Sequence, residues 1–153
     1  MTLLYQAAGF FSEGEMKMVQ YPGVHYAKID ITTDGLTFEG QNVTVPATGF
    51  TKNSAGVHIE IPWKDISSAY KTKRRVMHVV KIETYSGKFY TIIPLDDLKH
   101  FIKQSKKNSI ALAETINKAR SQVESSQLNL CPKCGKPLKP DSDFCGDCGH
   151  KLK

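Results

Sequence analysis

The residues with the clearest potential for chemistry are the cysteines near the carboxyl end. All four lie in residues 130–153, LCPKCGKPLKPDSDFCGDCGHKLK, as two Cys-x-x-Cys-Gly units. This spacing lets both sulfurs of a unit point at one metal ion, and Gly135 and Gly149 permit the backbone to bend back toward the thiolates. The two units together predict a tetrahedral four-thiolate site with the ligands Cys131, Cys134, Cys145 and Cys148.

The expected metal is zinc, because four thiolates at tetrahedral corners suit Zn²⁺ and leave no open position for a substrate. We therefore predict one structural Zn²⁺ ion as the cofactor. An iron centre with four cysteine ligands has similar spacing and stays open as the alternative. Each unit also begins with an apolar residue and ends with Leu-Lys. The stretch from Leu130 to Lys153 resembles the short zinc ribbons appended to many microbial proteins.

Positive charge is concentrated in the middle of the chain. Residues 1–70 carry four Lys and seven acids, a net −3, whereas residues 71–120 carry twelve Lys or Arg and four acids, a net +8. The densest group, KTKRR, lies between two predicted strands and is expected at the tip of a hairpin. It could meet an acidic protein, a phosphate or an anionic lipid, and a solvated turn without a partner is the alternative. The candidate contacts are Lys71, Lys73, Arg74 and Arg75.

Motifs typical of catalysis are absent from the sequence. It contains no Gly-rich phosphate loop, no Gly-x-Ser-x-Gly elbow and no His-Glu-x-x-His. His25, His58, His78 and His100 are scattered along the chain. A closed zinc site does not activate water either. We therefore expect no enzymatic activity and no catalytic residues.

Composition and the amino end bear on location. The chain is 40% hydrophobic and 24% charged, and no apolar run approaches the roughly 18 residues of a membrane span. The first residues, MTLLYQAAGFFSEGE, have no basic start and match a secretory signal poorly. We expect a cytoplasmic protein without a transmembrane segment, whose thiols stay reduced and bind metal.

The first part of the chain is predicted to form short strands. Apolar and polar residues alternate over 27–31 and 57–63, and Asp34-Gly35 marks a turn before a strand at 36–38. Ser86-Gly87 is a hairpin signal, because glycine adopts a positive φ without steric cost. Further strands are expected at 66–72, 76–85 and 88–93, with a short edge strand at 43–45.

After Pro94 the apolar period becomes about 3.6, which predicts one long helix that can break near residues 106–109. Asp96 and Asp97 in its first turn suit the helix dipole. Its buried stripe is expected to comprise Leu98, Phe101, Ile102, Ser105, Ser109, Leu112, Ile116, Ala119 and Val123. The predicted fold class is α+β, mainly β: an antiparallel split barrel of about six or seven strands with a carboxyl-terminal capping helix, plus the small zinc-ribbon domain.

This order of elements resembles the pleckstrin-homology-like superfold, and specifically its GRAM-like lipid-domain relatives. The resemblance is carried by IPWKDISSAY at 61–70 and by VVKIETYSGKFYTIIPLDDLKHFI at 79–102, a hairpin that leads into the helix. The tryptophan typical of the closing helix in classical pleckstrin-homology domains is missing, since the single Trp is Trp63, and this favours the GRAM-like group. An unrelated small β-barrel with a terminal helix is the alternative.

Three segments follow from these patterns. We expect a pleckstrin-homology- or GRAM-like domain at 1–118 with its core at about 15–118, a helical polar linker at 119–129, and the zinc ribbon at 130–153. The expected function is a non-enzymatic zinc-binding interaction or adaptor module for a protein or peptide partner. The GRAM-like resemblance implies, as an alternative, peripheral binding to anionic lipid through residues 71–75. Nucleic-acid binding is less favoured, because aromatic residues are not interleaved with the basic ones.

Overall fold

The computed structural model describes residues 1–18, 21–45, 49–95, 101–127, 130–139 and 142–152. The chain divides into two compact units, Met1–Ala119 and Arg120–Lys153. The first unit contains the sheet and the larger part of the helix, and the second contains the end of the helix and the cysteine segment. Each unit is described by itself below.

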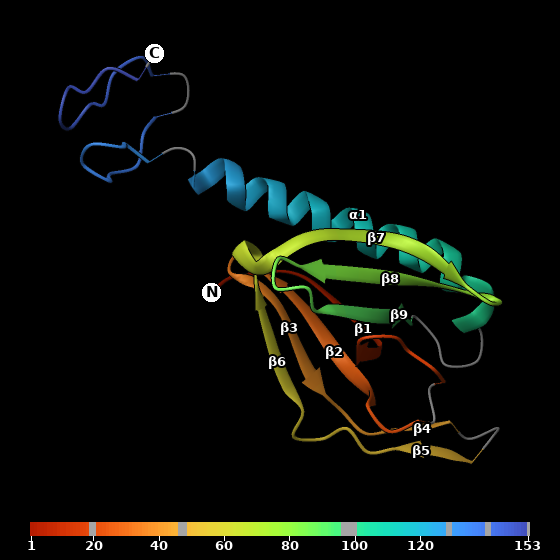
Figure 1. Ribbon diagram of the computed structural model, residues 1–153. Helices are drawn as coiled ribbons and strands as arrows, with labels where there is room; N and C mark the ends of the chain where they lie inside the picture. The colour runs from red at the N-terminus through yellow and green to blue at the C-terminus, as the bar shows by residue number, and fades with distance from the viewer. Residues whose placement is uncertain (19–20, 46–48, 96–100, 128–129, 140–141, 153) are drawn as a thin grey trace. The chain divides into compact units, whose positions relative to one another are not determined.

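Seven strands of the first unit form one antiparallel sheet in the order β6-β3-β2-β1-β9-β8-β7, which curls into a half-barrel (Figure 1). Their bounds are β1 Leu3–Glu13, β2 Val24–Thr32, β3 Gly35–Gly40, β6 His58–Pro62, β7 Ile66–Arg74, β8 Met77–Thr84 and β9 Phe89–Pro94. A separate hairpin consists of β4 Val43–Val45 and β5 Phe50–Lys52. The remaining elements are the 3-10 turn η1 Trp63–Asp65 and the helix α1 Phe101–Gln127. A mainly β, α+β fold is therefore confirmed.

The central strand β1 lies before the predicted core. The predicted core began at about residue 15, but β1 pairs with β2 over Leu3–Ser12 and with β9 over Gly9–Glu13. Phe10 and Phe11 are 1% and 0% exposed, although neighbouring residues of a strand point to opposite faces. Because both faces of β1 are covered here, its apolar residues do not alternate with polar ones, and a search for alternation misses it.

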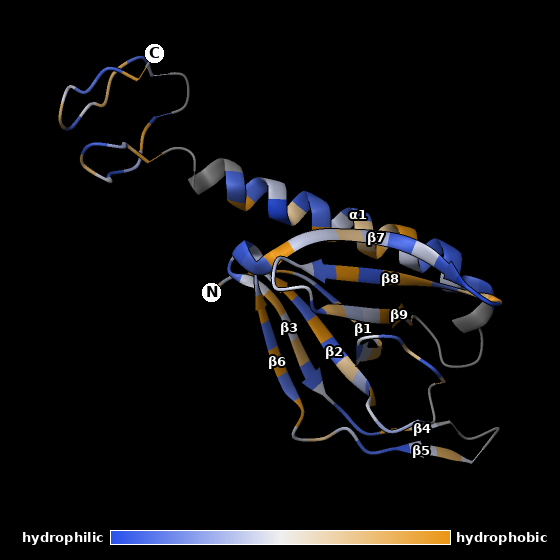
Figure 2. Ribbon diagram, in the orientation of Figure 1, coloured by the Kyte–Doolittle hydropathy of each residue, from blue (hydrophilic) through white to orange (hydrophobic). Residues whose placement is uncertain are grey.

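Hydrophobic residues recur along the strands of the sheet (Figure 2), and apolar side chains are buried on both of its faces. On one face Phe11 packs against Phe38 with ring centroids 4.8 Å apart. The hairpin of β4 and β5 contributes Val43 and Phe50 to a separate cluster, so it covers a face instead of forming the expected edge strand. The buried members of this cluster are Phe10, Met16, Val24, Val43, Val79, Ile93 and Leu95.

The hairpin predicted at Ser86-Gly87 is present, but its loop covers residues 85–88 and is longer than the two residues expected. Between β8 and β9, Gly87 has a φ of +84°, and its amide donates to the Thr84 carbonyl at 3.1 Å. A further hydrogen bond involves η1: the buried Trp63 donates its Nε1 hydrogen to the Thr32 carbonyl at 3.0 Å. Thr32 ends β2, so this bond holds η1 against the turn between β2 and β3.

The helix α1 is continuous through residues 106–109, where the sequence analysis allowed a break. The backbone N–H of His78 donates to Ser105 Oγ at 3.1 Å, and Ser109 Oγ donates to the His78 carbonyl at 3.1 Å. These buried polar residues therefore bond to β8 and do not interrupt the helix. Other buried residues of the predicted stripe are Leu112, Ile116 and Ala119.

Some predicted features fall outside what the structure describes. They are the helix start at Asp96 and Asp97, the stripe position Leu98, and the side chains of Phe101 and Ile102. Within the described ranges, α1 lacks the apolar length needed to cross a membrane, and no other helix has it.

Candidate metal centre and basic hairpin

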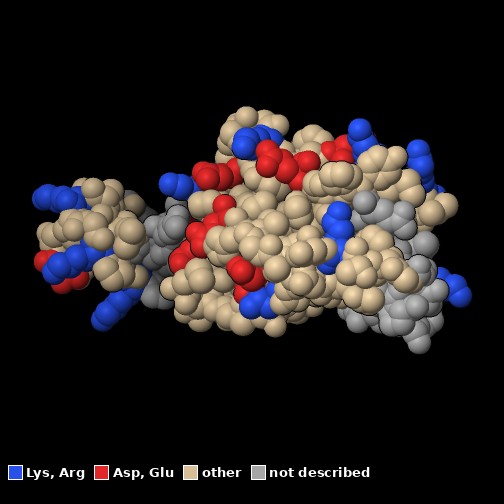
Figure 3. Space-filling view, turned by 90° about the horizontal axis from the view of Figure 1, so that it is seen from below, with Lys and Arg blue, Asp and Glu red and all other residues tan. Residues whose placement is uncertain are grey.

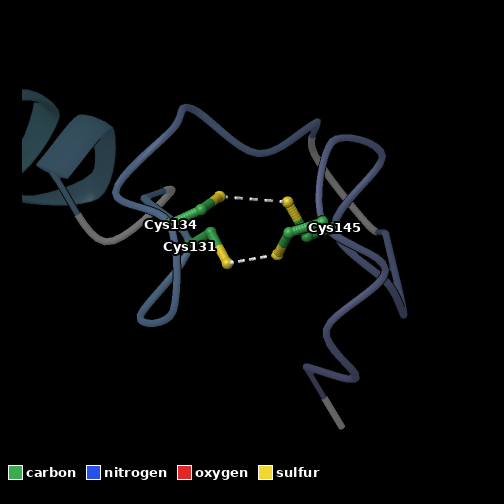
Figure 4. A group of neighbouring side chains, drawn as sticks. Cys131, Cys134 and Cys145 are labelled. Atoms are coloured by element: carbon green, nitrogen blue, oxygen red, sulfur yellow. Dashed lines mark hydrogen bonds between the residues drawn. The ribbon is translucent and has the colours of Figure 1, made fainter.

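Four sulfur atoms converge in the second unit (Figure 4). The Sγ atoms of Cys131 and Cys148 are 3.6 Å apart, and those of Cys134 and Cys145 are 3.7 Å apart. All four ligand atoms lie within 4.8 Å of one another. A tetrahedral ion with metal–sulfur bonds of about 2.3 Å separates its sulfurs by about 3.8 Å. The arrangement therefore fits Zn²⁺ held by four thiolates.

The two Cys-x-x-Cys-Gly units have the same backbone structure. The amide of Gly135 donates to the Cys131 carbonyl at 2.8 Å, and that of Gly149 to the Cys145 carbonyl at 2.9 Å. The two glycines have φ values of +70° and +69°, a left-handed conformation that other residues adopt only with strain. The repeat in the sequence is thus a repeat in the fold.

Lys136 and His150 occupy equivalent positions in the two units. The Cys131 amide donates to the Lys136 carbonyl at 2.8 Å, and the Cys145 amide to the His150 carbonyl at 2.9 Å. His150 therefore accepts a backbone hydrogen bond within the second Cys-x-x-Cys-Gly unit. Within the described ranges, the cluster of potential metal ligands consists of the cysteines alone.

The four cysteines differ in burial and hydrogen bonding, and the pKa values of their thiols differ as a result. Cys131 and Cys145 are buried, whereas Cys134 and Cys148 are exposed. Burial opposes ionisation of Cys131, but backbone amides and neighbouring thiols outweigh it and lower its pKa to about 6. Cys148 is exposed as a residue, but its sulfur is partly desolvated: the His150 amide favours the thiolate, yet this desolvation and the other thiols raise the pKa of Cys148 to about 12. A thiolate at one cysteine therefore opposes ionisation of its neighbours. A bound divalent cation offsets this repulsion and favours the thiolate form of all four.

A side-chain ion pair links the two Cys-x-x-Cys-Gly units. Lys136 Nζ of one lies 3.2 Å from Asp147 Oδ1 of the other. Leu130 and Phe144, the apolar residues before each unit, are 47% and 57% exposed. The ribbon therefore has little apolar core around its cysteines. No rule of local spacing pairs residues 136 and 147, so the sequence pattern does not predict this ion pair.

The basic residues at 71–75 lie mainly along a strand, which corrects the predicted hairpin tip. β7 continues to Arg74 and β8 begins at Met77, so the turn consists of Arg75 and Val76. Arg75 has a φ of +50°. The hairpin is longer than predicted because lysine and arginine remain solvated on an edge strand and do not prevent pairing.

Lys71 and Lys73 lie on one face of β7, since residues two apart in a strand share a face. Lys73 is paired with His78 across the ladder. Burial first, and then the charges of Lys71, Lys106 and Lys73, lower the pKa of His78. Because Lys106 belongs to α1, the helix brings a third lysine to this face, a placement that the sequence analysis left open.

Arg74 follows Lys73 and lies beside an acidic residue. Its Nη1 atom lies 3.5 Å from Glu15 Oε1, and Arg74 lines a hollow of about 260 Å³ together with Lys73 and Lys81. Lys81 Nζ lies 2.8 Å from Glu83 Oε1 and 4.5 Å from the Phe89 ring centroid. Glu15 and Glu83 therefore lie among these basic side chains. Acidic and basic side chains are also interspersed on the face that Figure 3 shows.

Comparison with known proteins bears on the cysteine segment. Residues 127–152 match the family model of a zinc-ribbon domain. This match and the clustered cysteines confirm the predicted carboxyl-terminal zinc ribbon and support zinc as its metal. A search of curated proteins found no match. Among solved structures, the C-terminal domain of an unknown protein from Leishmania infantum is similar, with a TM-score of 0.49 and 16% identity over 77% of this chain and 84% of that chain.

Proposed function

We propose that the protein is a non-enzymatic interaction module in which one structural zinc ion stabilises the ribbon. The observation that carries this proposal is the closed set of four sulfurs, all within 4.8 Å of one another. Four thiolates fill every position of a tetrahedral ion, so neither water nor substrate has a place on it. The zinc then maintains a folded surface, and the partner is a protein or peptide.

The sheet unit is proposed to be pleckstrin-homology-like, and GRAM-like within that group. Support comes from the seven antiparallel strands followed by one helix, which is the element order on which the resemblance rests. Such sheets offer edges and grooves that accept a strand or helix of a partner. The proposed boundaries are 1–118 for this domain, 119–129 for the linker and 130–153 for the ribbon, in a cytoplasmic protein.

Affinity capture from native lysate tests the interaction function. The baits are the intact protein and a Cys131→Ser, Cys134→Ser variant, which loses half of the metal ligands. We expect specific protein partners with the intact bait. Their loss with the variant would place the contact on the ribbon, and their retention would place it on the sheet unit. Recovery of no specific protein by either bait would contradict the proposal.

Elemental analysis tests the metal independently of any partner. We expect one zinc per chain in the intact protein and none in the variant. Iron in the purified protein, with the visible absorption of an iron–thiolate centre, would support the alternative metal.

Membrane binding is the second candidate, and the tip of the β7–β8 hairpin favours it. Val76 is 73% exposed and follows Arg75 in the turn, so an apolar side chain projects next to basic ones. A valine can enter the lipid interface while each nearby basic residue adds roughly 1 kcal/mol on an anionic membrane. Lys73 is exposed as well, whereas Arg74 is close to Glu15.

Vesicle flotation separates this candidate from protein binding. We expect the intact protein to float with phosphatidylserine-containing vesicles, to stay behind with neutral ones, and to be released by salt. Lys73→Glu with Arg75→Glu should abolish flotation, and Val76→Ser should weaken it. Lys64→Glu with Lys118→Glu changes charge equally at exposed positions outside the hairpin and serves as the control. Equal loss in both double variants would argue against a specific hairpin contact.

A further inference from the structure

The first half of β1 has a free edge. The ladder between β1 and β9 covers Gly9–Glu13, and the next bond on that side runs from the Leu95 amide to the Ala8 carbonyl at 2.8 Å. Before Ala8, the described part of the chain supplies strand β2 on one side of β1 and no strand on the other. Among the described residues, therefore, residues 3–7 have no strand partner on this side and present a free strand edge in the middle of the sheet order.

The two strands separate at Gly9 and Pro94, which are paired. Pro94 has no amide hydrogen to donate, which suits the end of a ladder. A Cβ atom at Gly9 would lie 2.4 Å from the Ile93 carbonyl oxygen, so the strands approach closely just before they part. The free edge is thus built into the fold.

A groove of about 670 Å³ runs beside this edge, between β1 and α1. Its β1 wall consists of Tyr5, Gln6, Ala7 and Ala8, and the helix contributes Lys107, Asn108, Ala111 and Leu112. Short alanine side chains on both walls leave the β1 backbone open to the groove. Just outside, Leu3 and Leu4 are 54% and 45% exposed and offer apolar contacts.

Hydrogen-bonding groups face the groove. The Ala8 carbonyl points toward the β9 side, and residues two apart in a strand point the same way, so the Gln6 N–H and C=O also point to the open edge. Asn108 is 8% exposed, and its Nδ2 has no hydrogen-bond partner in the described structure. An incoming backbone would satisfy such donors and acceptors.

The charges around the groove select its occupant. Lys107 lines it, and Lys103 lies one turn earlier on the same side of α1; both are exposed and have no ion pair among the described residues. Lys28 also lines it and is 3.0 Å from Asp30. A second copy of this chain would bring the same lysines opposite one another, which is repulsive. The groove is therefore complementary to a negatively charged strand.

We propose that this groove binds an extended acidic peptide segment of a partner protein, added as a strand to the free edge of β1. Its backbone pairs with Gln6, its acidic side chains lie toward Lys107, and its apolar side chains contact the exposed leucines. The proposal rests on the proposed interaction function and gives it a site and a partner chemistry.

Fluorescence anisotropy with the full chain tests the groove. The probe is a labelled peptide that alternates valine and glutamate, compared with one that alternates valine and lysine. We expect the glutamate peptide to bind at least about tenfold more tightly, and Lys107→Glu to weaken it about tenfold. Lys118→Glu, a charge reversal at an exposed position outside the groove, should leave binding unchanged.

Two further variants test the strand edge itself. Gln6→Pro removes the backbone donor on the open edge and should abolish binding, whereas Gln6→Ala keeps the donor and should bind like the parent. Ala111→Trp fills the groove from the helix without altering β1 and should also abolish binding. Hydrogen exchange should show the Gln6 amide becoming protected when the glutamate peptide is added.

Several outcomes would overturn the proposal: no binding of the glutamate peptide, equal binding by Gln6→Pro and Gln6→Ala, or no protection of the Gln6 amide. Sedimentation that shows a dimer, with the Gln6 amide protected in the absence of peptide, would make a second copy the occupant instead. If a partner captured from lysate still binds Gln6→Pro and Ala111→Trp, the interaction function stands and this site fails.

Discussion

The ribbon and the sheet unit are stabilised by different interactions. In the ribbon, two short copies of one turn bring four sulfurs together, while its leading apolar residues Leu130 and Phe144 stay exposed. In the sheet unit, strands far apart in the chain pair, and aromatic residues such as Phe11 and Phe38 are fully buried. The ribbon therefore depends on a metal ion, and the sheet unit on burial of apolar surface.

Removal of the metal should produce the largest difference between the two units. Zinc supplies about 10 to 16 kcal/mol of apparent free energy to small structural sites, so a strong chelator should unfold the ribbon. Amide NMR signals from residues 130–152 should collapse to unfolded positions, and those of the sheet unit should stay. Loss of the sheet signals in the same titration would show that the units do not fold separately.

Truncation of a core aromatic residue should have the converse effect. Phe11→Ala removes a side chain that is 0% exposed and should lower the free energy of unfolding of the sheet unit by about 3 to 5 kcal/mol. Chemical denaturation followed by circular dichroism measures this loss, and zinc content should not change. Tyr85→Ala, at a residue that is 70% exposed, is the control and should have little effect.

Crowding at Gly9 should have a smaller effect. In Gly9→Ala the new Cβ would meet the Ile93 carbonyl oxygen at 2.4 Å, so the strands must shift. We expect a loss of about 1 to 3 kcal/mol in thermal or chemical denaturation. Gly146→Ala in the ribbon meets no atom within 4 Å and should leave stability unchanged. Equal stability of Gly9→Ala and the parent would mean that the two strands separate more easily than the packing indicates.

The smallest effect concerns histidine ionisation in the sheet unit. Hydrogen bonds that the His58 ring donates to the carboxylates of Glu39 and then Glu60 raise the pKa of His58, while burial and then the charge of Lys52 lower the pKa of His25. The pairing of His58 therefore stabilises the fold fully below the pKa of the unfolded imidazole, and this contribution is lost as the pH rises through the raised folded pKa. NMR titration should give the order His58 above His25. Glu39→Gln should lower the pKa of His58, and an unchanged value would exclude that contact.

The sequence predicts the structure of the ribbon in more detail than that of the sheet unit. In the ribbon, a local spacing rule identifies Cys131 and Cys145 as ligands and the following glycines as turns, because the backbone hydrogen bonds of each Cys-x-x-Cys-Gly unit fall within a few residues. In the sheet unit, alternation finds β2 and β6, but it misses β1, whose residues 10 and 11 are both buried.

Long-range proximity accounts for the other gaps. The position of Lys106 beside Lys71 and Lys73 depends on how α1 lies on β8, and no periodicity in the sequence contains that relation. The same holds for the ion pair between Lys136 and Asp147. Residue patterns therefore predict elements and ligands well, and predict the surfaces formed between distant elements poorly.

Ser105 and Ser109, which bond to the backbone of His78, also determine the axial position of α1 on the sheet. An apolar stripe repeats about every turn, so Leu112 and Ile116 alone would tolerate a slip of four residues, about 6 Å. Such a slip would leave at most one serine in place to bond with His78, because Ser105 and Ser109 are one turn apart. The two serines thus select one axial position of α1 among several that would bury similar apolar surface. They thereby determine which side chains of α1 lie beside the free edge of β1.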